Sequence, residues 1–411
     1  MQQGAVVRTR VAVGATYAAQ GFGYATVVTA LPGLKARTGI EDDTIALVLL
    51  LGAVLAAGGS VTAERLARRW SSRTAVVVGL LAQAVGLACV AAVTSVPPLV
   101  ASFVVFAIGL GMVDASCNMQ GVALQHRVGR SILSTLFGCL TGAAIVAALA
   151  QSALSNLGKT TGAVTALVVA AVVAAVVAVA VRPGLVHGSA DDAVPQDVEV
   201  IAPGARTGVA TDAPHERPRA PLPRAGIWLF GSLVAVAFVV DSAVSSWSTV
   251  YLDDELLASG SVAPLGYAAY QGAVLLARLA GDPLVRRHGR VRVAVPTAAV
   301  AAAGLFLVAL VPSAPAAIAG FAFAGIGVGA LVPLAFSAAG ELAPARLDDV
   351  VARINLFNYA GAVLGAVVIG LLSEVTGLGP AFLVPALMLV PAMAIVPRLA
   401  VRASADTSAA R

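Results

Sequence analysis

The sequence predicts an all-α integral membrane protein with twelve transmembrane helices in two pseudo-symmetric six-helix bundles. The first observation is composition: of 411 residues, 59% are hydrophobic and 11% charged, with a mean hydropathy of +0.92. In soluble domains about a quarter of the residues are charged. The second observation is that apolar runs of about 20 residues, the length that crosses a bilayer, follow one another almost end to end. The third is a polar segment that divides these runs into two equal sets.

Each predicted span is an apolar run bounded by charged or turn-forming residues. The spans are expected at 11–34, 45–65, 74–95, 98–123, 131–155, 161–181, 226–252, 262–284, 293–312, 315–340, 351–373 and 379–399. Residues 182–225 are rich in proline and poor in large apolar side chains, a composition that cannot bury a core. We therefore expect a cytoplasmic linker at 182–225 between an N-terminal six-helix bundle, 1–181, and a C-terminal six-helix bundle, 226–411.

The basic residues gather in alternate loops. Loops on the side of the two termini carry arginines such as Arg8, Arg10, Arg65, Arg68, Arg69, Arg73, Arg127, Arg130, Arg286, Arg287, Arg290 and Arg292. Loops on the other side carry Lys35, Arg37 and Lys159 together with the acids Asp253, Asp254 and Glu255. By the positive-inside rule, both termini of this multi-pass cell-membrane protein are expected to be cytoplasmic. The net charge of +5 then reflects orientation rather than a nucleic-acid partner, and the short loops fit a bacterial inner membrane.

Two carboxyl groups fall inside predicted spans, where ionisable side chains are costly and usually functional. Asp114 lies in the fourth span with Asn118, which is four residues further on and therefore on the same helix face. Asp241 lies about fifteen residues, or about 22 Å, into the seventh span, near the middle of the hydrocarbon core. We expect both acids to be sites of reversible protonation. The alternative for Asp241 is a bond to a nearby hydroxyl that serves assembly alone.

Further polar side chains lie at three- and four-residue spacings on single helix stripes. The candidate substrate-binding residues are Asn118, Gln120, Gln20, Tyr24, Trp247, Gln271, Asn355, Asn358 and Tyr359. Each of them, taken singly, is also compatible with a hydrogen bond between helices. The sequence contains no phosphate-binding loop, metal-ligand spacing or convincing Ser/His/Asp arrangement, so we expect no enzyme activity, no metal and no cofactor.

The two halves of the sequence repeat each other at a nearly constant offset, which indicates an internal duplication. The matching features are Arg68 and Arg286 (286 − 68 = 218), Gly109 and Gly325 (325 − 109 = 216), and Leu136 and Leu356 (356 − 136 = 220). Paired glycines also recur, at Gly138 and Gly142 in the fifth span and at Gly361 and Gly365 in the eleventh. Small residues at this spacing predict close helix packing.

The loop from Ser60 to Arg69 resembles the Gly-x-x-x-Asp-Arg-x-Gly-Arg-Arg signature of the major facilitator superfamily, and a degenerate second copy occupies 281–290. With two parallel six-helix halves, this resemblance implies the major facilitator fold and transport by alternating access. It also implies that charges in these loops latch the helix ends, although they could equally serve orientation alone. The candidate gating residues are Glu64, Arg65, Arg68, Arg69, Asp282, Arg286 and Arg287.

A narrower resemblance covers the fourth and fifth spans. The stretches 109–118 and 142–152 are similar to the corresponding helices of fucose/proton symporters, in which the acid and the asparagine four residues on line the sugar site. Those symporters also carry a proton-linked aspartate on the first helix, before a Leu-Pro pair. Here Thr26 to Thr29 precede Leu31, and we expect Asp241 to take that role.

These resemblances imply a secondary active transporter that moves a small polar solute, such as a sugar or sugar derivative, together with protons. The solute, protons and the bilayer are the expected partners, and the chain is expected to be monomeric. One alternative is proton-driven efflux of an amphipathic metabolite or drug, although the fifth span lacks the Gly-Pro pair of drug/proton antiporters. The other is a transporter-like receptor that binds a ligand without translocating it.

Overall fold

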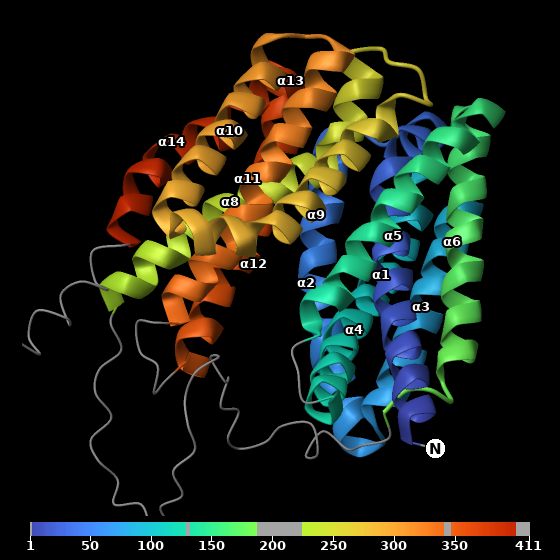
Figure 1. Cartoon of the computed structure of the whole chain (residues 1–411). Helices are drawn as coiled ribbons and strands as arrows, with labels where there is room; N and C mark the ends of the chain where they lie inside the picture. Colours follow the sequence, from blue (N-terminus) through green and yellow to red (C-terminus); the bar gives the residue numbers. More distant parts are fainter. Residues whose placement is uncertain (1, 129–131, 187–223, 341–346, 400–411) are drawn as a thin grey trace, which may run out of the picture.

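The computed structural model describes residues 2–128, 132–186, 224–340 and 347–399, and the secondary structure of these residues is entirely helical. The first bundle contains helices that run alternately up and down (Figure 1). Its elements are α1 (Gln2–Thr38), α2 (Asp42–Arg69), α3 (Ser72–Ala92), α4 (Val96–Val128), α5 (Leu133–Leu154), the short η1 (Ser155–Leu157) and α6 (Lys159–Val181).

The second bundle lies beside the first and repeats its alternation (Figure 1). Its elements are α8 (Arg224–Val250), the π-helical turn η2 (Tyr251–Glu255), α9 (Ala263–His288), α10 (Arg290–Leu310), α11 (Ala314–Gly340), α12 (Leu347–Thr376), α13 (Leu378–Ala381), α14 (Leu383–Ile395) and η4 (Val396–Leu399). Every predicted span coincides with a helix, and the last one divides into α13, α14 and η4. Of the expected linker at 182–225, residues 187–223 lie outside the described part of the chain.

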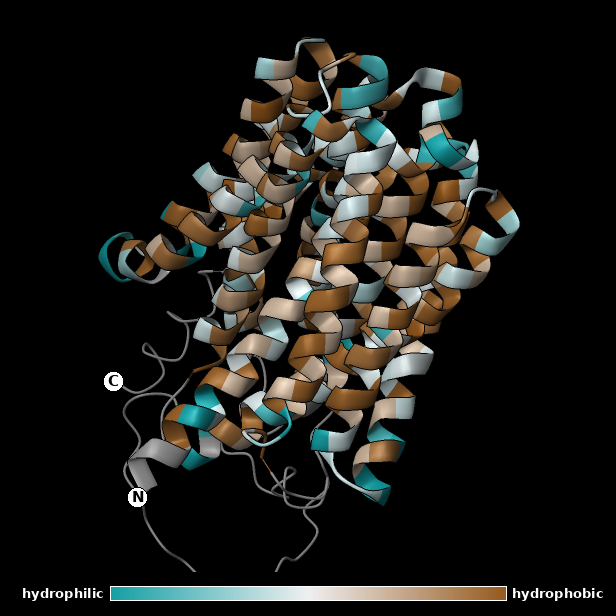
Figure 2. Cartoon of the chain, turned by 90° about the vertical axis from the view of Figure 1, so that its right-hand side faces the viewer, coloured by the Kyte–Doolittle hydropathy of each residue, from teal (hydrophilic) through white to brown (hydrophobic). Residues whose placement is uncertain are grey.

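Ten of the described helices are long and apolar enough to cross a membrane. The helices α1 and α9 fall outside this set, and both carry polar residues in their middle turns, including Gln20 and Gln271. Hydrophilic residues gather near the helix ends, and the middle of the molecule is largely apolar (Figure 2). The predicted all-α membrane fold is therefore confirmed.

Two names are useful for the ends of the bundles. The terminal end is the end at which α1 begins and α6 finishes; the loop end is the end at which α1 finishes and α6 begins. The two bundles lie close together at the loop end and diverge toward the terminal end (Figure 1). The helix pairs α5–α9 and α2–α12 pack against each other across the boundary between the bundles.

Glycines set the distance between α8 and α12. A Cβ atom added at Gly361 would lie 2.3 Å from the carbonyl oxygen of Ala235, and one at Gly365 would lie 2.3 Å from that of Val239. At Gly138 and Gly142 of α5, by contrast, no atom of the described residues lies within 4 Å of such a Cβ. The prediction of close packing is confirmed for the α12 pair and is wrong for the α5 pair in this conformation.

The contrast between the packed glycines of α12 and the open glycines of α5 can be tested with glycine-to-alanine substitutions. We expect Gly365→Ala to lower the free energy of unfolding by about 1–3 kcal/mol, because the added methyl forces α12 away from α8. Gly142→Ala is the matched control and should keep or raise the melting temperature, since alanine favours helix and the space is open. Thermal unfolding in detergent measures both. Equal melting temperatures for the two variants would contradict this packing.

Candidate functional site

Polar side chains of α1 and α4 bond to each other in register inside the first bundle. The Tyr17 hydroxyl donates to Oδ1 of Asn118 at 2.9 Å, and Nε2 of Gln20 donates to Oδ1 of Asp114 at 3.3 Å. Tyr17 and Gln20 are one turn apart on α1, and Asp114 and Asn118 are one turn apart on α4, so successive turns of the two helices pair. Tyr17 and Gln20 are buried, whereas Asp114 is exposed beside them. Asp114 is therefore accessible as well as hydrogen-bonded.

A second acid cluster lies between α8 and α9. The Tyr270 hydroxyl donates to Oδ1 of Asp241 at 2.5 Å, and Nε2 of Gln271 donates to the Tyr267 hydroxyl at 3.0 Å. Tyr270 and Tyr267 are fully buried, and Asp241 and Gln271 are half-buried. A short hydrogen bond from a phenol holds this carboxyl in one position.

One stripe of α1 connects the two clusters. Tyr17 and Gln20 bond to α4, and Tyr24, four residues after Gln20, lies close enough to Asp241 to interact with it electrostatically. Tyr24 also packs beside Tyr267 in an apolar cluster that joins α1, α5 and α9. The predicted acids of both bundles are thus brought to the same central helix, together with Asn118, Gln20, Tyr24 and Gln271.

Ion pairs close the boundary between the bundles at the loop end. Lys35, at the end of α1, pairs with Asp42 of its own bundle and with Asp254 of the other. Lys159, at the start of α6, pairs with Asp253, whose side chain is only 6% exposed. From the sequence alone, these charges are interpreted as loop residues that set the orientation of the protein in the membrane. Their sign was the signal that could have been used: both lysines belong to the first bundle, and Asp253 and Asp254 belong to the second.

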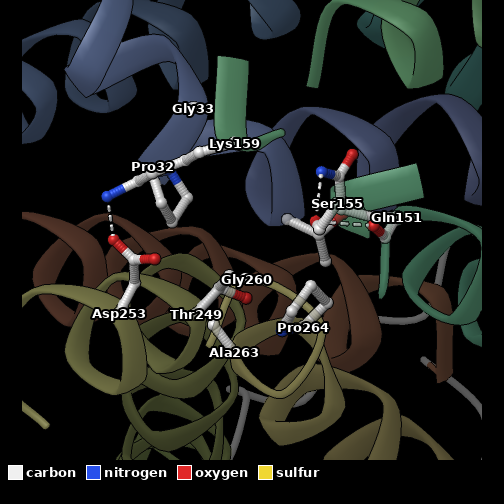
Figure 3. A pocket seen from close by; sticks show the side chains of 11 residues that line it. Pro32, Gly33, Gln151, Ser155, Lys159, Thr249, Asp253, Gly260, Ala263 and Pro264 are labelled. Atoms are coloured by element: carbon white, nitrogen blue, oxygen red, sulfur yellow. Dashed lines mark hydrogen bonds and ion pairs between the residues drawn. The ribbon is translucent and has the colours of Figure 1, made fainter. Parts of the chain in front are cut away.

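A small cavity lies beneath the Lys159–Asp253 pair, between α1, α5, α8 and the start of α9 (Figure 3). Its lining includes Thr29, Gln151, Thr249 and Pro264. Its volume of about 10 Å³ is near the lower limit for one water molecule. In addition, the Ser152 hydroxyl of α5 donates to the carbonyl of Ser261 in the other bundle. The loop end is therefore closed to a solute.

At the terminal end, the same helix faces separate. Gly370 of α12 lies against Ala46 of α2, whereas Tyr359, about three turns earlier on that face, is 66% exposed. On α5, Ala148 is buried in the cluster with Tyr267, whereas Gly138 and Gly142 meet open space. The central polar residues are thus covered from the loop end and approached from the terminal end.

Two predicted substrate contacts have structural partners. The Gln120 amide is fully buried; its Nε2 donates to the Ser72 hydroxyl and the Val186 carbonyl, and its Oε1 accepts from the Val186 amide. Trp247 is also fully buried, and its indole N–H donates to the Ala366 carbonyl at 2.8 Å. Both side chains are buried among the described helices in this conformation, and their roles as solute contacts stay a prediction.

The remaining predicted residues lie toward the terminal end. Asn358 is half-buried and Tyr359 exposed on α12, and the side chain of Asn355 lies outside the described residues, as does that of Asp282. Glu64 pairs with Arg68 within α2, and Arg69 lies over the Trp70 ring at 5.7 Å. Arg65, Arg286 and Arg287 are exposed. The gating roles of these residues stay a prediction, because the described gating-loop contacts remain inside one bundle.

A family comparison decides what kind of protein has this arrangement. The model of the Major Facilitator Superfamily matches residues 13–254 and again 229–411. The chain belongs to the Major Facilitator Superfamily. It is therefore a multi-pass membrane transporter, as the loop signature implied.

Relatives of this superfamily member cover different shares of the chain. An uncharacterized MFS-type transporter of Yersinia pestis is 28% identical over 374 residues, which is 90% of each chain. The membrane protein MosC of Rhizobium meliloti is 30% identical over 155 residues, or 38% of each chain. An uncharacterized transporter of Sinorhizobium fredii is 33% identical over 166 residues, 40% of this chain and 44% of its own.

Solved transporter structures share the fold at low sequence identity. The nucleoside transporter NupG has a TM-score of 0.70 at 14% identity, covering 95% of this chain and 98% of its own. A bacterial homolog of the human lysosomal transporter Spinster, inward-facing and occupied, also has a TM-score of 0.70, at 13% identity and 95% coverage of both chains. The transporter FucP in the outward conformation has a TM-score of 0.58 at 16% identity, covering 95% and 98%.

The loop-end ion pairs make a testable prediction. Lys159→Met leaves the Asp253 carboxylate buried without its partner, which typically costs about 3–5 kcal/mol. We expect a membrane-impermeant thiol reagent, added from the loop end, to label Thr29→Cys at least tenfold faster in this variant, with Cys89, Cys117 and Cys139 replaced.

Arg37→Met is the matched control, because Arg37 lies at the same end and, within the described part of the chain, donates to the Ala91 and Ala92 carbonyls of its own bundle. Unchanged labelling in Lys159→Met, or an equal increase in Arg37→Met, would show that the ion pair does not hold the bundles together.

Proposed function

We propose that this superfamily member is a secondary active transporter that moves a small polar solute by alternating access, coupled to protons. The observation that carries the proposal is Asp114: an exposed carboxyl at the level of the central polar residues, bonded to Gln20 and one turn from Asn118. Asn118 keeps its amide nitrogen free of the bond to Tyr17 and can donate to a solute hydroxyl. Amide and phenol groups at this spacing suit sugars and sugar derivatives.

Gln20 supports reversible protonation of Asp114. Its Nε2 donates to the carboxyl, but its buried Oε1 has no hydrogen-bond partner among the described residues. A protonated Asp114 has an O–H donor, which could satisfy that oxygen once the amide turns. The same pair of side chains can therefore hold either charge state with a hydrogen bond. An unsatisfied buried oxygen costs about 1–3 kcal/mol, so the exchange is energetically relevant.

Asp241 is proposed as the second protonation site. It receives its bond from Tyr270, and Tyr24 of the central helix lies near it. A change in charge at Asp241 would alter the contact of α1 with the second bundle, while a change at Asp114 would alter its contact with the first. Alternating access would then follow from rocking of the two bundles about α1, with the loop-end ion pairs separating in the opposite state.

The orientation proposed for the transporter follows its arginine distribution. Exposed arginines at the terminal end, including Arg68, Arg69, Arg286 and Arg287, place that end in the cytoplasm by the positive-inside rule. The conformation described here would then be inward-facing. We also propose a bacterial inner-membrane location, a monomer, and a cytoplasmic linker within 182–225.

Counterflow in proteoliposomes tests the proposal. We expect wild-type protein to exchange a labelled sugar or sugar derivative from a matched panel, and Asn118→Ala to raise the half-saturating concentration about two- to tenfold, the effect of one hydrogen bond of about 0.5–1.5 kcal/mol. Asn156→Ala is the control, because Asn156 is exposed at the loop end.

The other readings predict different results. Exchange of amphipathic drugs alone, insensitive to Asn118→Ala, would favour efflux and contradict the polar-solute assignment. Binding of a panel member without any exchange would favour the receptor and overturn transport of that solute.

A further inference from the structure

Arg278 occupies an unusual place on α9. It lies 15 residues after the start of the helix at Ala263 (278 − 263 = 15), or about 22 Å along its axis, which is within the span of a hydrocarbon core about 30 Å thick. Spacings of four and seven residues place Tyr267, Gln271 and Arg278 on one stripe. Tyr267 shares an apolar cluster with Ala144 and Ala148 of α5, so the stripe faces the first bundle at its Tyr267 end.

Arg278 is exposed, on the same stripe as Tyr267 and Gln271, and the two bundles diverge toward the terminal end (Figure 1). Just before Arg278, α9 is held closely against α11: a Cβ atom added at Gly329 would lie 2.7 Å from the Val274 carbonyl oxygen and 2.8 Å from Cβ of Ala277, and one added at Gly325 would lie 2.4 Å from the Tyr270 carbonyl oxygen. The backbone that carries Arg278 is thus fixed, and its side chain is free to meet a solute that enters from the terminal end.

Asp241 does not neutralise the charge of Arg278 by direct contact. Arg278 is close enough to Asp241 and Tyr270 to interact with them electrostatically. Oδ1 of Asp241, however, accepts the 2.5 Å hydrogen bond from Tyr270, and no hydrogen bond or ion pair to the Arg278 guanidinium is found within the described ranges. A cation at this depth is costly, and such residues usually serve a ligand.

We propose that Arg278 binds a carboxylate of the transported solute, so that the substrate class of this transporter is a small polar organic acid, such as a sugar acid. This inference rests on the proposed transport function and names its substrate class. The guanidinium presents a planar fork of N–H donors that matches both oxygens of a carboxylate. On the facing side, the amide of Asn118 remains for the hydroxyl groups of the solute.

The surrounding charge favours a carboxylate over a phosphate. One guanidinium balances one negative charge, and Asp241 lies close enough to Arg278 to interact with it electrostatically, while Asp114 is a further exposed carboxyl of the first bundle. A phosphate group, which carries about two charges near neutral pH, would leave negative charge uncompensated beside these two carboxyls. The expected solute therefore bears a single carboxylate.

The test uses matched pairs of probes. Thermal stabilisation of purified protein is measured with glucuronate and glucose, with galacturonate and galactose, and with glucose 6-phosphate, because a bound ligand raises the apparent melting temperature by mass action. We expect at least one sugar acid to bind and its neutral partner to bind at least tenfold more weakly. Arg278→Gln should weaken binding of the acid at least tenfold, and Arg292→Gln, an exposed arginine on α10, should leave it unchanged.

Arg278→Lys keeps the positive charge but loses the planar set of guanidinium N–H donors. This variant tests the proposal if Arg278→Gln does not fold. We expect it to bind the acid at least threefold more weakly than wild type. Equal affinity of the wild-type protein for an acid and its neutral sugar, tighter binding of glucose 6-phosphate, or wild-type affinity in the Arg278 variants would overturn the assignment.

Counterflow experiments distinguish failure of the carboxylate assignment from failure of the transport proposal. If neutral sugars exchange in wild type and in Arg278→Gln alike, transport stands and the carboxylate assignment falls. If a sugar acid binds through Arg278 but does not exchange, the carboxylate site stands as a binding site and the transport proposal falls.

Discussion

Inside a bilayer, polar side chains must find partners within the protein, and in this chain α1 supplies them. Its stripe of Tyr17, Gln20 and Tyr24 reaches Asn118 and Asp114 in one bundle and lies beside Asp241 of the other. Asp114 bonds to this helix directly, and Asp241 is close enough to Tyr24 to interact with it electrostatically, so a change of charge at either acid acts on α1. The polar core of the transporter is therefore shared between bundles that are otherwise packed separately.

The contacts between the bundles are unequal at the two ends. Buried and half-buried ion pairs, a serine hydrogen bond and alanine-rich packing join them at the loop end, whereas glycines of α5 and Tyr359 of α12 meet open space toward the terminal end. Separating Lys159 from Asp253 would expose polar groups that water can solvate, so this end can open at limited cost. Ionic contacts suit a boundary that must close and reopen better than a continuous apolar interface does.

The helices could be predicted from the sequence because bilayer thickness fixes their length, and periodicity placed Asp114 and Asn118 on one face. The partners of the acids could not be predicted, because the bonds Gln20–Asp114 and Tyr270–Asp241 depend on the register between helices distant in sequence. The structural partners of Gln120 and Trp247 could not be predicted for the same reason: Val186 and Ala366 reach them only after folding. From the sequence, Lys35 and Lys159 could be interpreted only as loop charges that set membrane orientation, because their partners Asp254 and Asp253 lie in the other bundle.

The central claim is that Asp114 couples solute movement to protons, and proton flux tests it most directly. Proteoliposomes that contain a pH-sensitive dye would receive a gradient of a solute that the wild-type protein exchanges by counterflow. The account predicts a solute-driven pH change in wild type and none in Asp114→Asn, although the variant still exchanges solute. An equal pH change in the variant, or solute accumulation without proton movement in wild type, would contradict the account.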